Sequence, residues 1–186
     1  VAAQTYRDFE VIVIDDASEC KEALASTLKK WAISFADAGI NFTAASLAEN
    51  SGYQAAPKNQ GVEQASGDYI CFLDDDNEYD PRFLEVMVAA MEAGDVWPHV
   101  VYCRWRYVRD EGVPEMTADG IALPEGETPL VPFDPVRLVT SPLGNFIDTS
   151  SFMTSRGMFW YAHELTGSMW NERWRRFGDW ELLARL

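Results

Sequence analysis

The sequence predicts an α/β fold with a mostly parallel central sheet and helices on both of its faces. In the first half of the chain, short β-branched runs alternate with segments of helical periodicity, and two of these runs end in clusters of aspartate. A β-α-β-α-β order brings successive strands into one parallel sheet. The 186 residues suit a single domain with a sizeable core.

The start of the chain predicts a strand, a helix and a second strand. Residues 10–14 (EVIVI) suit a buried parallel strand. Ser18 is the expected N-cap of the helix that follows, and Gly39 is expected to close it. Residues 40–44 form the next strand. The residues expected on the inner face of the helix are Leu24, Leu28, Trp31 and Phe35.

The next segment predicts two more helices and a third strand. A helix is expected over residues 59–64, and the apolar run at residues 68–73 (DYICFL) predicts a buried strand. Pro81 is expected to open the third helix, because proline is tolerated in a first helical turn. The residues expected on the inner face of that helix are Phe83, Leu84, Met87 and Met91.

The second half of the chain has a less regular pattern. Residues 100–108 and 146–154 are expected strands, and residues 179–186 are an expected helix. Residues 110–135 are rich in proline, glycine and acidic side chains, which favours a long loop with or without a short hairpin. Loops of that length usually carry function or move.

Charge and cysteine usage limit the classes of function. Thirty acidic and fifteen basic side chains give a formal net charge of −15, which repels phosphate backbones, so no nucleic acid is expected as a partner. Cys20, Cys71 and Cys103 lack metal-ligand spacing, which predicts reduced thiols and a cytoplasmic protein. Cys71 lies in an apolar run and is interpreted as a small buried hydrophobic residue.

Carboxylates follow two of the predicted strands. Asp15 and Asp16 end the first strand, and a run of three aspartates at residues 74–76 ends the third. In an open parallel sheet, ligands bind at the carboxyl ends of the strands. Carboxylates gathered at one edge repel each other unless a cation or hydrogen-bond donors offset the charge. The alternative stays open that these aspartates serve only as helix caps and turn residues.

Two segments carry a resemblance to a known enzyme family. They are QTYRDFEVIVIDDAS at residues 4–18 and KNQGVEQASGDYICFLDDDN at residues 58–77. Together and in this order they closely resemble the family 2 glycosyltransferases of the GT-A fold, from the start of the chain to about Leu84 and more loosely from Ser150 onward. The resemblance implies a Rossmann-like, three-layer α/β/α architecture. It also implies an inverting transfer of a sugar from a nucleotide-sugar donor to an acceptor hydroxyl.

The resemblance also assigns a donor site. Asp15 and Asp16 would lie beside the base and ribose of the nucleotide, UDP or GDP being the expected carriers. Lys58 precedes an Asn-x-Gly motif and would help to hold the nucleotide, although Arg, with its planar fork, is more usual there. Asp74 and Asp75 belong to the family's Asp-x-Asp motif and would complete the site.

A divalent cation, Mn²⁺ or Mg²⁺, is the cofactor that the resemblance implies. Asp76 and Asp74 would bind it where it bridges the two phosphates. Such a cation neutralises the charge that develops on a diphosphate leaving group. Asn77 stands where another aspartate is common in the family.

The catalytic base implied by the resemblance is Asp179. FGDWELLARL at residues 177–186 resembles the family segment in which an aspartate deprotonates the acceptor hydroxyl, although Gly178 stands where Glu is common. Asp179 would otherwise only cap its helix. The expected acceptor is a carbohydrate, a glycolipid or a glycan. Each of the tryptophans in the last quarter suits a core position by itself, but as a group they favour an acceptor groove; they are Trp160, Trp170, Trp174 and Trp180.

Compared with the family pattern, the chain is expected to be a fragment. The apolar strand that precedes the Gln-Thr-Tyr of residues 4–6 is missing, and the last helix stops in mid-pattern. Unpaired neighbours of a missing central strand favour self-association. The expected organisation is one GT-A domain, with a nucleotide-sugar-binding half at residues 1–95 and an acceptor-binding half at residues 96–186. The protein is expected to be cytoplasmic, and the full-length form either free in the cytoplasm or bound at the cytoplasmic face of a membrane.

Two alternatives from other classes of function remain open. One is a nucleotide- or metal-binding module of GT-A type without catalysis, against which the presence of both Asp76 and Asp179 argues. The other is a sugar nucleotidyltransferase, which usually opens with a glycine-rich phosphate loop that this sequence lacks.

Overall fold

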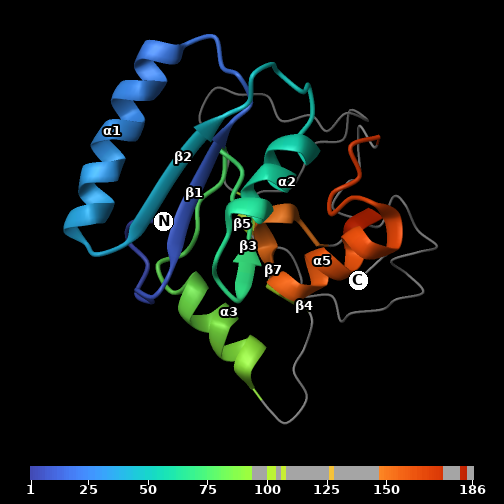
Figure 1. Ribbon diagram of the computed structural model, residues 1–186. Coiled ribbons are helices and arrows are strands. Elements are labelled where there is room, and N and C mark those ends of the chain that lie inside the picture. The colour runs from blue at the N-terminus through green and yellow to red at the C-terminus, as the bar shows by residue number, and fades with distance from the viewer. Residues whose placement is uncertain (94–99, 104–105, 108–125, 128–146, 174–180, 184–186) are drawn as a thin grey trace.

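The computed structural model describes residues 1–93, 100–103, 106–107, 126–127, 147–173 and 181–183. Its elements are shown in Figure 1. In chain order they are β1 (Glu10–Asp15), α1 (Lys21–Asp37), β2 (Asn41–Ser46), α2 (Ala55–Gln64), β3 (Tyr69–Cys71), α3 (Phe83–Glu92), β4 (Val100–Tyr102), β5 (Arg106–Tyr107), β6 (Gly126–Glu127), a 3-10 turn (Thr149–Ser151), β7 (Phe152–Ser155) and α5 (Arg156–Thr166).

The described strands form three hydrogen-bonded groups. β1 and β2 pair in parallel, with Glu10 opposite Asn41 and Asp15 opposite Ser46. β7 lies between β3 and β4 and is antiparallel to both. β5 and β6 form a short antiparallel pair. The expected α/β class is confirmed. The strand predicted near residues 146–154 corresponds to β7, which is antiparallel to its two neighbours and joins the second half of the chain to β3 of the first half.

Helices cover both faces of the β3–β7–β4 sheet. Ile70 and Phe152 point to a core shared with α2 and α5, whereas Cys71 and Met153 point to a second core against α3. Adjacent residues of each strand thus alternate between the two faces, as the pleat requires. This is the three-layer α/β/α arrangement, with α3 on one side of the sheet and α5 on the other (Figure 1).

Helix α1 differs from its prediction at its start and along its inner face. Phe35 is its one buried side chain, stacked on Phe42 of β2 with ring centroids 5.4 Å apart, whereas Trp31 is 39% exposed. Ser18 is not the N-cap, because its N–H and hydroxyl both donate to the Asp15 carboxylate at the end of β1. The predicted end is confirmed: Gly39 has a φ of +71°, which glycine adopts without steric cost.

Three other boundaries shift from their predicted positions. α2 begins at Ala55 rather than at residue 59, and α3 begins at Phe83, after a turn that contains Pro81. The prediction of a strand from residue 146 was wrong in its first part. The Asp148 carboxylate accepts the N–H of Ser150 at 2.8 Å and closes a 3-10 turn there, so the strand begins at Phe152. The predicted inner face of α3 is confirmed, since Phe83, Leu84, Met87 and Met91 are all buried.

The N-terminal Gln-Thr-Tyr segment holds the start of α3. Gln4 is 3% exposed; its Oε1 accepts the N–H of Leu84 at 2.8 Å, and its Nε2 donates to the Asp80 carbonyl at 2.7 Å. Thr5 adds a hydrogen bond from its hydroxyl to the Glu85 carboxylate at 2.8 Å. Because the first N–H groups of a helix lack intrahelical acceptors, Gln4 acts as a cap supplied from 80 residues away.

We expect Gln4→Ala to lower the free energy of unfolding by about 1–3 kcal/mol, because it leaves the buried Leu84 N–H without its acceptor. Denaturant titration measures the change. Gln64→Ala, at an exposed position on the last turn of α2, is the matched control and should stay within about 0.5 kcal/mol of the parent. Equal effects of the two substitutions would contradict the capping role.

β1 and β3 are not hydrogen-bonded to each other in the described part of the chain. They are tied by a side chain instead: Glu10 Oε1 accepts from the N–H and hydroxyl of Ser66 at 2.7 and 2.9 Å and from the Gly67 N–H at 3.0 Å. Partial burial alone would raise the pKa of Glu10, but these hydrogen bonds outweigh it and lower the pKa. The expected self-association through unpaired strand edges stays a prediction.

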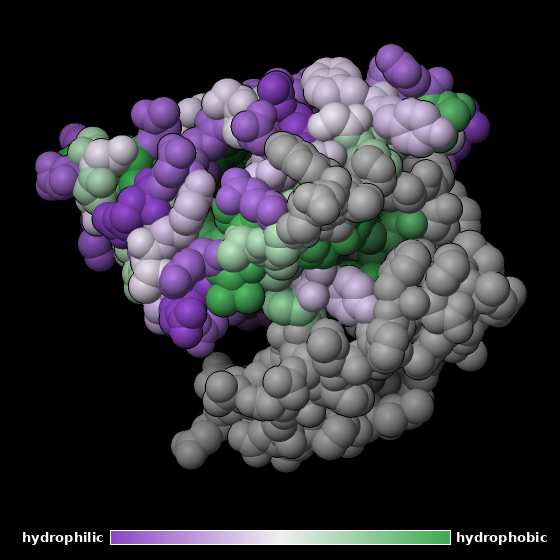
Figure 2. Space-filling model, turned by 90° about the horizontal axis from the view of Figure 1, so that it is seen from below, coloured by the Kyte–Doolittle hydropathy of each residue, from purple (hydrophilic) through white to green (hydrophobic). Residues whose placement is uncertain are grey.

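The surface on the α3 side is apolar at its centre. Seen from below the view of Figure 1, hydrophobic residues occupy the middle of the described part of this face, and hydrophilic residues lie to the left of them and above them (Figure 2). Val86 of α3 is one exposed apolar side chain, with 50% of its surface accessible. Among the described helices, none combines the length and the apolar character needed to cross a bilayer.

Candidate functional site

The first acidic pair ends β1, and its two members have different partners. Asp15 is buried, and one of its carboxylate oxygens accepts the Ser18 N–H at 3.0 Å together with the Ser18 hydroxyl. The hydrogen bond from that hydroxyl lowers the pKa of Asp15, so the group is ionised at neutral pH. Asp15 therefore fixes the loop that follows β1 and holds a negative charge there.

Asp16 is bound to the segment that precedes α2. Its two carboxylate oxygens accept from Ser51, one from the N–H at 2.8 Å and the other from the hydroxyl at 2.9 Å. The Asn50 side chain donates to the Asp16 carbonyl at 2.7 Å. The end of β1 is thereby held against residues 50–51, and the Asp16 side chain stays partly accessible.

Lys58 and Asp74 form an ion pair at the end of β3. Their charged atoms lie 3.1 Å apart, and their side chains are 10% and 34% exposed. The Lys58 ammonium also donates to the Gln54 side chain and lies over two aromatic rings, 5.0 Å from the centroid of Trp170 and 5.5 Å from that of Phe72. Lys58 thus neutralises one carboxylate of the three-aspartate run.

The three-aspartate run continues into a turn fixed by Ser150, a residue that sequence reasoning missed. The Ser150 hydroxyl oxygen accepts the Asp74 N–H at 3.2 Å and the Asn77 side-chain amide at 3.0 Å. Asp148 in turn binds the Ser150 N–H, so its role is structural. The only sequence signal was an Asp two residues before a Ser, which is a common turn pattern. Asp75 and Asp76 project from this turn and are exposed.

One segment connects the two acidic clusters. Residues 51–58 supply Ser51 to Asp16 and Lys58 to Asp74, so one cluster is attached to the segment before α2 and the other to α2 itself. In Figure 1 the carboxyl ends of β1 and β2 point toward the side of the molecule where α2 lies. Of the predicted donor-site residues, Asp16, Lys58 and Asp74 are thus linked through residues 51–58. Asp15 is bound to Ser18 instead, and Asp75 is exposed.

Comparison with known proteins identifies the family. Residues 1–162 match the family described as Glycosyl transferase family 2. The chain belongs to this family. The expected family is therefore confirmed, and the acidic clusters lie in a glycosyltransferase domain.

Curated relatives match about half of this domain. The amylovoran biosynthesis glycosyltransferase AmsB of Erwinia amylovora is 33% identical over 89 residues, which cover 48% of this chain and 28% of that protein. The GalNAc(5)-diNAcBac-PP-undecaprenol beta-1,3-glucosyltransferase of Campylobacter jejuni is 32% identical over 101 residues, or 52% of this chain and 29% of that protein. The matched regions thus span less than a third of either relative.

Solved structures show the same fold. TarS of S. aureus, residues 1–349 in complex with UDP, aligns with a TM-score of 0.65 and 18% identity over 99% of this chain and 47% of that one. The same part of TarS without a named ligand aligns with a TM-score of 0.67 and 19% identity. The expected GT-A fold is confirmed by these alignments.

The C-terminal part of the predicted site is described only in part. Asp179, Trp174 and Trp180 lie outside the described residues. Trp170 is fully buried and belongs to the core between the sheet and α5, whereas Trp160 is 43% exposed on α5. The expected acceptor groove stays a prediction.

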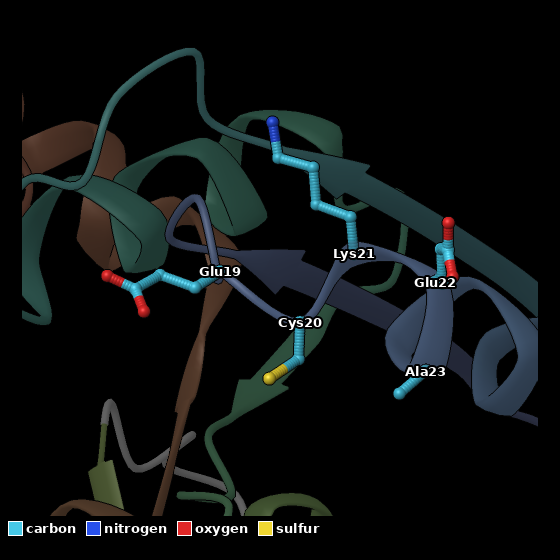
Figure 3. Close-up of a pocket in the computed structure, with 5 residues that line it drawn as sticks. All are labelled: Glu19, Cys20, Lys21, Glu22 and Ala23. Carbon is cyan, nitrogen blue, oxygen red and sulfur yellow. The ribbon is translucent and has the colours of Figure 1, made fainter.

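A shallow cavity of about 450 Å³ lies at the start of α1, and none of the three aspartates at residues 74–76 lines it. It is lined by Glu19, Cys20, Lys21, Glu22 and Ala23. These side chains do not converge: Lys21 points to one side of the segment, and Cys20 and Ala23 point to the other (Figure 3). The cavity is therefore not a candidate ligand site.

We expect Ser150→Ala to loosen the turn that carries Asp74 to Asn77 and to lower the free energy of unfolding by about 1 kcal/mol. Hydrogen exchange is the direct measurement, because the Asp74 amide loses its acceptor and should exchange faster. Ser150→Thr keeps the hydroxyl and is the matched control. Unchanged protection of the Asp74 amide in Ser150→Ala would show that Ser150 does not hold the turn.

Proposed function

We propose that this domain transfers a sugar from a nucleoside-diphosphate sugar to an acceptor hydroxyl by a single displacement that inverts the anomeric configuration. The observation that carries the proposal is the attachment of both acidic clusters to one segment, residues 51–58, in a chain of glycosyl transferase family 2. In α/β sheets, ligands bind at the carboxyl ends of the strands, where these clusters lie. No observation favours either a sugar nucleotidyltransferase or a module without catalysis.

The donor nucleotide would bind between the ends of β1 and β3. Asp15 and Asp16 would lie beside the base and ribose, and Lys58, Asp74 and Asp75 would face the rest of the donor. TarS, which shares the fold, was crystallised with UDP and with UDP-GlcNAc, and this supports a UDP-linked donor ahead of a GDP-linked one. Residues 1–95 would form the donor half and residues 96–186 the acceptor half of one domain.

The exposed carboxylates suit a divalent cation that is shared with the donor. Within the described residues, no three His, Cys, Asp or Glu side chains are placed to hold a metal by themselves. Asp76 is exposed, whereas Asp74 is engaged by Lys58. Mg²⁺ is usually bound by one or two carboxylates together with substrate phosphates, so Asp76 and Asp74 fit this kind of site. When bound there, Mn²⁺ or Mg²⁺ would neutralise the charge that develops on the diphosphate.

Asp179 would act as the general base. In the reaction, the acceptor oxygen bonds to the anomeric carbon, the bond from that carbon to the diphosphate oxygen breaks, and the acceptor proton passes to the Asp179 carboxylate. A carboxylate suits this transfer when it lies within hydrogen-bond reach of the hydroxyl. The names of the two relatives point to a polysaccharide or lipid-linked glycan as the acceptor.

We expect UDP to bind in calorimetric titration when Mn²⁺ is present, and Asp76→Ala to weaken binding about tenfold or more, because it removes a carboxylate ligand of the cation. GDP and metal-free titrations show which base and which cation the site requires. Asp37→Ala, at an exposed position on the last turn of α1, is the matched control. UDP affinity that is the same with and without Mn²⁺, and the same in Asp76→Ala as in the parent protein, would contradict the proposed cation site.

Asp179→Asn separates catalysis from binding. We expect it to lower the rate of sugar transfer by about 10²–10⁴-fold while the affinity for UDP stays unchanged, because the amide cannot accept the acceptor proton. The rate of sugar transfer to lipid-linked or oligosaccharide acceptors is measured as the rate at which UDP is released. Transfer at the parent rate would remove Asp179 from the mechanism.

A further inference from the structure

The Asn59 side chain joins α2 to the chain segment that follows α5. Its Oδ1 accepts the N–H of Trp170 at 2.7 Å, and its Nδ2 donates to the Trp170 carbonyl at 2.9 Å. The same Nδ2 also donates to the Glu172 carboxylate at 3.0 Å. A single amide therefore binds both backbone groups of a residue 111 positions away, as a neighbouring strand would.

These hydrogen bonds fix the position of the Trp170 indole. Trp170 is fully buried, and its ring packs edge-on against Phe72, with centroids 5.2 Å apart and planes at 88°. The indole N–H has no hydrogen-bond partner in the described part of the chain. The ring is thus held by its packing and by the backbone contacts with Asn59, and not by its own polar atom.

The indole in turn lies beside the Lys58 ammonium. The nitrogen is 5.0 Å from the Trp170 ring centroid and 3.1 Å from the Asp74 carboxylate. A cation facing an aromatic ring at this distance is attracted to it, and more strongly where water is excluded. Because the Lys58 side chain is only 10% exposed, its charge is sensitive to any change in the groups that surround it.

We propose that Asn59 is a positioning residue of the donor site, which acts by fixing Trp170 against the Lys58 ammonium. This inference rests on the proposed function, because it takes Lys58 to be part of a nucleotide-diphosphate site. Through Asn59, the segment at residues 169–172 controls where the positive charge at the end of β3 lies. A shift of this segment would move the indole away from Lys58. The Lys58 ammonium would then depend mainly on the Asp74 carboxylate for its position.

The chemistry requires an amide at position 59. Alanine would remove all three hydrogen bonds. Aspartate would keep the acceptor for the Trp170 N–H, but it would turn a carboxylate toward the Trp170 carbonyl and the Glu172 carboxylate, where like charges repel. Asn59→Asp is therefore expected to disturb the segment at least as much as Asn59→Ala.

The first test is the affinity for UDP in the presence of Mn²⁺, measured by calorimetry on the parent protein, Asn59→Ala and Asn59→Asp. We expect each substitution to weaken binding by about tenfold, which corresponds to about 1.4 kcal/mol. Asn41→Ala is the matched control, because Asn41 is exposed at the start of β2. Parent affinity in both Asn59 variants would overturn the inference.

A double-mutant cycle with Lys58→Gln distinguishes positioning from a general loss of structure. If Asn59 acts through Lys58, Asn59→Ala should have almost no further effect on UDP affinity in the Lys58→Gln background. Effects that simply add would overturn the inference, because they would show that the two residues act separately.

Two substitutions of Trp170 keep the test decisive if the Asn59 variants unfold. Trp170→Phe keeps an aromatic face for Lys58, whereas Trp170→Leu fills the site with aliphatic atoms. Trp170→Phe should retain most of the UDP affinity, and Trp170→Leu should lose about tenfold. Equal affinities of these two variants would overturn the inference. Failure of the parent protein to bind any nucleotide would instead overturn the proposed function, and the inference with it.

Discussion

The ion pair between Lys58 and Asp74 is the interaction on which the site depends. An ammonium with a side chain 10% exposed is stable only if its lost hydration is compensated by close partners. The structure supplies a carboxylate, an amide oxygen and two aromatic faces from three different parts of the chain. As a result, α2, β3 and the segment after α5 have to be assembled together before the charge is accommodated.

The remaining carboxylates divide into two kinds. Asp15 and Asp16 are occupied by serine donors, so their charge is compensated locally and fixes the loops around them. Asp75 and Asp76 are exposed at the turn after β3, next to an aspartate that Lys58 already neutralises. In a protein with a net charge of −15, this exposed pair is well suited to attract a cation and, through it, a phosphorylated ligand.

Features that depend on local pattern could be predicted from the sequence, and features that depend on distant partners could not. The three strands of the first half, the inner face of α3 and the glycine that ends α1 follow from periodicity and backbone preference. The roles of Gln4, Ser150 and Asn59 depend on partners 80, 76 and 111 residues away, which no short motif reveals. The prediction that Ser18 caps α1 was wrong, because a serine can hydrogen-bond either to a helix end or to a nearby carboxylate. Here Ser18 donates to the Asp15 carboxylate. Asp179 stays a prediction based on resemblance.

The capping of α3 by Gln4 has a consequence for how the chain folds. The acceptor for the Leu84 N–H lies in a segment 80 residues earlier, so α3 cannot complete its first turn from its own sequence. Contacts of such high sequence separation form late, because a long loop has to close before they contribute. During synthesis, residues 4–5 leave the ribosome long before α3 exists. The N-terminal segment therefore stays undocked until residues 80–85 have been made, and its docking is expected to coincide with the formation of α3.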